Sequence, residues 1–167
     1  MFSIIAAIGK NRELGKKGGL VFNIKEDMKF FKNTTTGHKV VMGRKTWESL
    51  PSKLSNRENI VISRNHIDGA DLIISNISTF IEQNQNTEEE IFIIGGGTIY
   101  TKFLPYAKNL YLTEINASAP NADVFFPKFD KSKYKKTIIK KGSQDDLTYT
   151  FVKYTKKIRR NYARSNI

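Results

Sequence analysis

Short apolar runs that alternate with helical patterns constrain the fold of this chain more than any other feature of its sequence. Each run is rich in Ile and Val and ends at a glycine or a polar residue, which is typical of strands buried on both faces of a sheet. Strands and helices in alternation indicate βαβ units and a mostly parallel sheet. We expect strands at 3–8, 39–43, 59–63, 71–75, 91–95 and 109–115, and helices at 24–33, 44–50, 77–85 and 98–104.

The C-terminal part of the chain has a different pattern. Residues 148–154 alternate apolar and polar side chains, as an antiparallel edge strand does, and residues 134–139 could pair with them. A chain of 167 residues without an internal repeat or linker is long enough for one core. We therefore expect one domain over residues 1–156 and a basic, poorly ordered tail over residues 157–167.

Composition limits the chemistry that this chain can perform. It has no cysteine and two isolated histidines, His38 and His66, so disulfides, thiol nucleophiles and the usual metal sites are not expected. Catalysis would use carboxylates, hydroxyls, backbone dipoles or a bound cofactor. No apolar run approaches the ~18 residues of a bilayer span, and the N-terminus lacks the basic segment of a signal peptide. We expect a cytoplasmic protein with no membrane partner.

The net charge of +12 is concentrated in the C-terminal third. Residues 128–141 contain seven Lys and one Asp, residues 153–167 contain six Lys or Arg and no acid, and residues 1–127 contain 15 basic and 13 acidic side chains. A solvated face with a frayed tail and a nucleic-acid surface both fit this distribution. We favour the solvated face and expect no specific nucleic-acid partner, because most of these lysines lack neighbouring aromatic side chains that could stack on bases.

One carboxylate lies within the apolar stripe of the first expected helix. Ile24, Asp27, Met28 and Phe31 have the spacing i, i+3, i+4 and i+7, so they share one helix face. Asp27 could be a partly solvated first-turn acid that the helix dipole favours. Alternatively, it could line a pocket and pair with a cationic or hydrogen-bond-donating ligand group, because an unpaired buried carboxylate is costly.

Two junctions between strands and helices could bind phosphate. The glycines at 95–97 end a strand and open a helix, where free N–H groups attract an anion. They could equally form a tight turn, and they match neither the common dinucleotide fingerprint nor a P-loop. Residues 43–46 supply two cations and a hydroxyl, which could converge with Ser63 and Arg64 on one dianionic phosphate or remain separate on the surface.

Two further polar features lie in expected loops. The glycine-bearing segment 9–19 has little to pack, and we expect it to be a mobile loop beside the sheet edge where open α/β folds bind ligands. Arg57 follows a polar turn and could be a surface charge or a clamp for a substrate carboxylate.

Several blocks, in register, resemble the bacterial dihydrofolate reductase family. They are VMGRKTWESL at 41–50, RENIVIS at 57–63, IIGGGTIY at 93–100 and LTEI at 112–115, preceded by IIAA at 4–7 and by Asp27 with Phe31. The resemblance covers residues 2 to about 154 and implies an α/β fold. Its central twisted sheet would have eight mostly parallel strands, with antiparallel C-terminal strands, and about four flanking helices. The implied reaction is NADPH-dependent reduction of 7,8-dihydrofolate, with hydride transfer from nicotinamide C4 to pterin C6 and protonation of N5, in a protein that antifolates bind. We expect a monomer, because nothing in the sequence suggests an exposed apolar patch.

The same resemblance implies roles in catalysis and substrate binding. Asp27 matches the family's acidic active-site residue, which bonds the pterin 2-amino group and N3, and Thr113 supports it. Leu20 and Phe22 belong to the catalytic loop, and Arg57 clamps the α-carboxylate of the folate glutamate. The other implied substrate-binding residues are Ile5, Met28, Phe31, Leu50, Leu54, Ile94 and Tyr100.

Cofactor binding is implied at the phosphate-binding junctions and the loop. Arg44, Ser63 and Arg64 would read the 2′-phosphate, which predicts NADPH over NADH, and the bond between Gly95 and Gly96 would be a cis peptide. The other implied cofactor-binding residues are Ala7, Leu14, Gly15, Gly43, Lys45, Thr46, Asn76, Gly97, Thr98 and Ile99.

The chain departs from the family pattern in its catalytic loop. Leu20-Val21-Phe22 stands where the family usually has Met-Pro-Trp, and Phe22 lacks the indole N–H that helps to hold a water near the pterin. Without the proline, the loop over residues 15–22 should be looser. Ser52 replaces an arginine often found near the folate tail. These departures affect the expected turnover rate and trimethoprim sensitivity more than the reaction class.

A related reductase fold remains an alternative. It acts with NADPH on a ribosylated pyrimidine intermediate of riboflavin synthesis and does not keep the pair formed by Asp27 and Phe31. The presence of Asp27 argues against that substrate.

Overall fold

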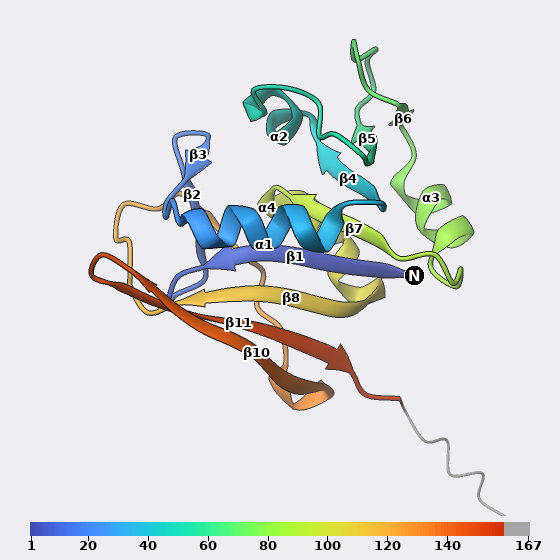
Figure 1. Ribbon diagram of the computed structural model, residues 1–167. Coiled ribbons are helices and arrows are strands. Elements are labelled where there is room, and N and C mark those ends of the chain that lie inside the picture. The colour runs from blue at the N-terminus through green and yellow to red at the C-terminus, as the bar shows by residue number, and fades with distance from the viewer. Residues whose placement is uncertain (159–167) are drawn as a thin grey trace, which may run out of the picture.

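An eight-stranded sheet forms the centre of the computed structural model, which describes residues 1–158 (Figure 1). Its strands are β1 (Phe2–Ile8), β4 (Lys39–Gly43), β5 (Glu58–Ile62), β6 (Leu72–Ile74), β7 (Ile91–Gly95), β8 (Ala107–Ile115), β10 (Tyr134–Gln144) and β11 (Leu147–Lys156). The spatial order is β10-β11-β8-β1-β7-β4-β5-β6. The strands from β8 to β6 pair in parallel, whereas β11 pairs antiparallel with β8 and β10. The expected mostly parallel sheet with antiparallel C-terminal strands is confirmed.

Four α-helices connect or flank these strands, at positions within one or two residues of those expected. They are α1 (Lys25–Thr35), α2 (Arg44–Ser49), α3 (Ile77–Asn84) and α4 (Gly97–Phe103), and two short 3-10 helices are η1 (Leu104–Tyr106) and η2 (Lys131–Lys133). The first turn of α1 contains Glu26 and Asp27 and its last turn contains Lys32, which suits the helix dipole. Phe30 stacks on Phe151 of β11 with ring centroids 4.5 Å apart, so α1 is fixed against the sheet.

The parallel strands are buried on both faces because successive side chains alternate between two apolar clusters. Ile4 and Val41 belong to the cluster on one face, whereas Ile5 and Val40 belong to the cluster on the other. This explains why the strands are continuous apolar runs.

The segment after β1 is more ordered than expected. β2 (Glu13–Lys16), β3 (Gly19–Leu20) and β9 (Val124–Phe125) form a second sheet in the order β3-β2-β9. The expectation of a mobile loop over residues 9–19 is wrong for Glu13, Leu14 and Gly15, which are buried. Leu14 packs into the core, and the Glu13 carboxylate accepts hydrogen bonds from the N–H groups of Asn11 at 2.6 Å and Ala119 at 2.5 Å.

The end of the described chain continues past β11 by two exposed residues, and the Lys157 N–H donates to the carbonyl of Lys133 at 2.9 Å. Residues 159–167 of the expected tail lie outside the described residues. Within residues 1–158, no helix has the length and apolar character that crossing a membrane requires.

Candidate active site

Asp27 lies in the first turn of α1 and is half-buried against β8. Its Oδ1 accepts a hydrogen bond of 2.5 Å from the hydroxyl of Thr113, a buried residue of β8. Burial raises the pKa of Asp27, and the Thr113 hydrogen bond lowers it by less. Asp27 was interpreted either as a first-turn acid that the helix dipole favours or as a carboxylate that lines a pocket. The structure has features of both, because the carboxylate is at the helix N-terminus and also in a partly apolar site.

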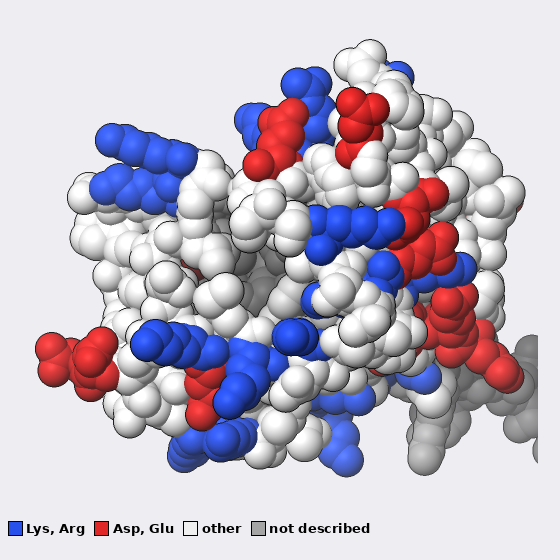
Figure 2. Space-filling model, turned by 45° about the horizontal axis from the view of Figure 1, so that its top comes forward, with Lys and Arg blue, Asp and Glu red and all other residues white. Residues whose placement is uncertain are grey.

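An apolar wall lies next to this carboxylate on the same face of the sheet. The buried or half-buried members of one cluster include Ile5, Phe31, Leu50, Leu54 and Ile94, all of them expected substrate contacts. Met28, expected in the same wall, is 60% exposed. Figure 2 shows a hollow near the middle of the face that carries α1, with Lys and Arg side chains around it.

Tyr100 supports the wall from behind. Its hydroxyl lies 2.8 Å from the carbonyl oxygens of both Ile5 and Ile94, and can donate to either. Burial raises the pKa of Tyr100, and the negative charge of Asp27 raises it further. Tyr100 therefore stays protonated and ties β1 to β7 beside the site.

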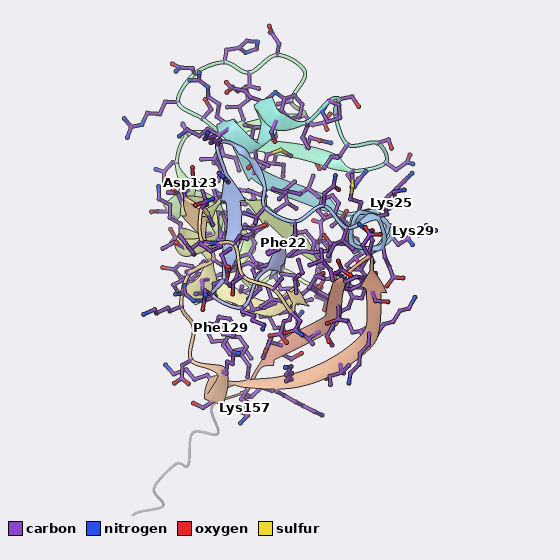
Figure 3. The ribbon with its side chains drawn as sticks, turned by 90° about the vertical axis from the view of Figure 1, so that its left-hand side faces the viewer. Phe22, Lys25, Lys29, Asp123, Phe129 and Lys157 are labelled. Carbon is purple, nitrogen blue, oxygen red and sulfur yellow. The ribbon has the colours of Figure 1, made fainter. Side chains whose placement is uncertain are left out.

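The residues expected in the catalytic loop occupy different environments. Phe22 and Ala7 are half-buried and pack against the cluster that contains Ile24 and Phe151. Figure 3 shows Phe22 between Asp123 on one side and Lys25 and Lys29 of α1 on the other. Leu20, at the end of β3, is 68% exposed.

Arg57 is half-buried beside the apolar wall. Its Nε donates to the carbonyl of Ser55 at 2.9 Å, and a terminal nitrogen donates to the Thr35 hydroxyl at 3.1 Å. The guanidinium carbon lies 5.8 Å from the centroid of the Phe31 ring. Partial burial lowers the pKa of Arg57, but an arginine remains charged at neutral pH. A cavity of about 710 Å³ is lined by Arg57 and Leu54.

The expected phosphate contacts meet at the carboxyl edge of the parallel strands. Gly95 of β7 pairs with Met42 of β4, and Gly43 of β4 pairs with Ile62 of β5. The residues that follow these strands, including Thr98 and Ile99 of α4, Arg44 to Thr46, and Ser63 with Arg64, therefore leave the sheet side by side. The Gly95–Gly96 bond is cis, as the resemblance implies.

Three of the expected cofactor-binding residues at this edge already have contacts within the protein. Arg44 forms an ion pair with Glu48 at 2.8 Å, and both side chains are exposed. Asn76 caps α3, because its Oδ1 accepts from the Thr79 N–H at 3.0 Å. A Cβ on Gly43 would lie 3.1 Å from Ile99 Cγ1, so glycine suits the close approach of β4 and α4.

Three polar side chains that the sequence analysis did not single out hold the segment 13–25, which contains the expected catalytic loop. Glu13 accepts from the Ala119 N–H, Asp123 Oδ2 accepts from the Lys17 N–H at 3.0 Å, and Gln144 Oε1 accepts from the Lys25 N–H at 2.9 Å. The only local signal was that Glu13 is the one acid in the basic segment 9–19. Their partners are more than 100 residues away, so spacing alone could not reveal them.

The fold and this site define an α/β oxidoreductase with a carboxylate at an apolar cleft. The chain belongs to the dihydrofolate reductase family, whose family model, described as "Dihydrofolate reductase", matches residues 1–156. A dihydrofolate reductase from Bacillus subtilis is 36% identical over 163 residues, which cover 94% of this chain and 95% of the relative. One from Neisseria gonorrhoeae is 39% identical over 158 residues, covering 91% and 96%, and one from Buchnera aphidicola is 42% identical over 144 residues, covering 83% and 86%.

Proposed function

We propose that this protein reduces 7,8-dihydrofolate to 5,6,7,8-tetrahydrofolate with NADPH, and so supplies one-carbon metabolism. The observation that carries the proposal is the half-buried Asp27 carboxylate, held by Thr113 beside an apolar wall, in a chain that matches the family over residues 1–156.

Asp27 orients the substrate in this proposal. Its carboxylate accepts from the pterin 2-amino group and N3, while the Thr113 hydroxyl fixes one carboxylate oxygen. Burial keeps water away from these hydrogen bonds and strengthens them. The negative charge of the Asp27 carboxylate beside the pterin favours protonation of substrate N5.

The apolar wall and Arg57 hold the rest of the substrate. Ile5, Phe31 and Ile94 exclude water from the pterin and the aromatic linker. The Arg57 guanidinium, braced by Ser55 and Thr35, is a donor for the α-carboxylate of the glutamate tail.

The carboxyl edge of the sheet fits the cofactor. Arg44, Ser63 and Arg64 supply a hydroxyl and two cations for a 2′-phosphate, and the backbone around residues 96–98 is available to a pyrophosphate. NADPH, when bound, supplies the hydride that pterin C6 accepts. Ala7 and Leu14 are the protein's apolar contacts along the nicotinamide.

Antifolates of the 2,4-diaminopyrimidine class would pair with Asp27, since their protonated ring offers matching donors. Leu20 and Phe22 replace the usual loop residues, so we propose a trimethoprim affinity that differs from that of relatives with the common Met-Pro-Trp loop.

The test is direct. Purified protein should convert 7,8-dihydrofolate to tetrahydrofolate in the presence of NADPH, with the product identified by mass spectrometry. Consumption of a ribosylated pyrimidine instead of dihydrofolate would overturn the substrate assignment.

A further inference from the structure

A cavity of about 910 Å³ lies on the face of the sheet opposite Asp27. The side chain of Thr113 points toward Asp27, and neighbouring side chains of a strand point to opposite faces. Glu114, which lines the cavity, therefore faces away from Asp27. None of the described residues that line the cavity is among the catalytic, substrate or cofactor residues named above, so this is a second site.

The floor of the cavity is a row of paired residues across four strands. Lys141 of β10 pairs with Thr150 of β11, Thr150 pairs with Glu114 of β8, and Glu114 pairs with Ile8 of β1. All four line the cavity. Phe129, which follows β9, closes another side, and Figure 3 shows it on the side of the sheet away from Lys25 and Lys29. The cavity is therefore formed by the central strands β1 and β8 and by the antiparallel strands β10 and β11.

The cavity is strongly basic. Its lining includes Glu114 and five cationic residues, which are Lys10, Arg12, Lys128, Lys131 and Lys141. The Arg12 guanidinium also donates to the carbonyl of Phe126 and keeps its charge there. Glu114 is already neutralised, because its Oε1 lies 2.9 Å from Lys136 Nζ and its Oε2 accepts from the Tyr154 hydroxyl at 2.9 Å. The nearby Asp130 accepts from the N–H and hydroxyl of Ser132. Concave sites with charges of one sign concentrate the electrostatic field, so this cavity attracts a multivalent anion.

We propose that this cavity binds a triphosphate group, inorganic or carried by a nucleotide. A triphosphate concentrates several negative charges in a short length, and a cavity of this volume is in the ~300–1,000 Å³ range of small-molecule sites. Triphosphate binding also explains why lysines of the basic segment 128–141 line this cavity. The proposed reductase reaction does not use these lysines.

A single-stranded nucleic acid fits these observations less well. Such ligands stack their bases on exposed aromatic rings. The ring of Phe129 already packs against Phe126, Tyr134 and Tyr154, with centroids 6.0, 5.7 and 5.3 Å away. Phe129 is therefore held in an aromatic cluster and is only partly exposed for stacking on a base.

Calorimetric titration of the full chain with inorganic triphosphate tests the proposal, with and without excess NADPH so that binding at the cofactor phosphate contacts is distinguished. The variant Lys128→Gln with Lys131→Gln and Lys141→Gln removes three lining cations. The control Lys102→Gln with Lys108→Gln and Lys135→Gln removes three exposed cations that do not line the cavity, and so has the same net charge.

We expect one equivalent of triphosphate to bind in the presence of NADPH, about tenfold or more weakly in the cavity variant, and within about twofold of the unmodified protein in the control. ATP should compete if the triphosphate is the recognised group. Equal weakening of both variants, or binding that NADPH abolishes, would overturn the site. Binding of a single-stranded oligonucleotide without binding of triphosphate would assign the cavity lysines to nucleic acid instead. Because the cavity residues do not take part in hydride transfer, the rate of dihydrofolate reduction reports separately on the proposed function.

Discussion

The hydroxyl of Thr113 donates a 2.5 Å hydrogen bond to Asp27 across 86 positions of sequence. Thr113 pairs with Ala7 of β1 and with Phe151 of β11, so its position is set by two neighbouring strands. The bond stabilises the ionised form of Asp27, whereas burial of the carboxylate favours the protonated form more strongly, and the pKa is raised as a result.

The raised pKa of Asp27 predicts a pH-dependent stability change in Asp27→Asn. A carboxyl group whose pKa is raised by folding contributes stability that is present below its unfolded pKa and lost as pH rises through its folded pKa. Asp27→Asn should therefore increase the free energy of unfolding at neutral pH, and the difference should shrink as the pH falls. Urea unfolding between pH 4 and pH 7 measures this, with Asp68→Asn at a 99% exposed side chain as the control. A destabilised Asp27→Asn protein at neutral pH would contradict the cause given for the shift.

Glu13 should behave in the opposite way. Burial raises the pKa of Glu13, but the backbone hydrogen bonds from Ala119 and Asn11 lower it by more, so the net shift is downward. Such a group contributes stability above its unfolded pKa and loses it as pH falls through its folded pKa. Glu13→Gln should cost ~1–3 kcal/mol at neutral pH and less in acid. The same unfolding series tests this, and an effect that does not change with pH would show that the carboxylate charge is not responsible.

Arg57 should determine substrate affinity and have little effect on turnover. Loss of its charge-assisted hydrogen bonds in Arg57→Gln should raise KM for dihydrofolate by roughly 10- to 100-fold with little change in kcat. Lys53→Gln is the matched control, because Lys53 lines the same cavity but is paired with Asp71. Steady-state kinetics compare Arg57→Gln with Lys53→Gln. If Arg57→Gln lowered kcat without changing KM, Arg57 would not act as the clamp for the substrate carboxylate.

Arg64 should discriminate between the two nicotinamide cofactors. Arg64→Gln is expected to raise KM for NADPH by about tenfold and leave KM for NADH unchanged, because NADH has no 2′-phosphate. Lys108→Gln, at the start of β8 and away from the carboxyl edge of the sheet, serves as the control. Equal effects on both cofactors would place Arg64 elsewhere in the binding site. Adding Arg44→Gln to Arg64→Gln should raise KM for NADPH further. The added increase should be small, because Arg44 already pairs with Glu48.

Local pattern was sufficient to predict most strands and the four helices and to single out Asp27 as a candidate, because apolar runs and helical spacing depend on neighbouring residues. It did not predict the order of the strands, because that order depends on pairing between residues far apart in the sequence. The burial of Glu13 depends on the Ala119 N–H, which lies 106 positions away. Met28 was grouped with apolar neighbours by its spacing, yet it is 60% exposed, because spacing assigns a helix face and cannot say how much of that face the sheet covers.

We propose Asp27 as the acidic group that dihydrofolate reduction requires. The most direct measurement is the loss of NADPH absorbance after mixing protein, NADPH and dihydrofolate at neutral pH, for the unmodified chain and for Asp27→Asn. We expect turnover by the unmodified chain and a fall of at least about 100-fold in Asp27→Asn, with NADPH binding retained. Equal turnover by the two proteins would contradict the assigned role of Asp27, and absence of turnover by the unmodified chain would contradict the proposed reaction.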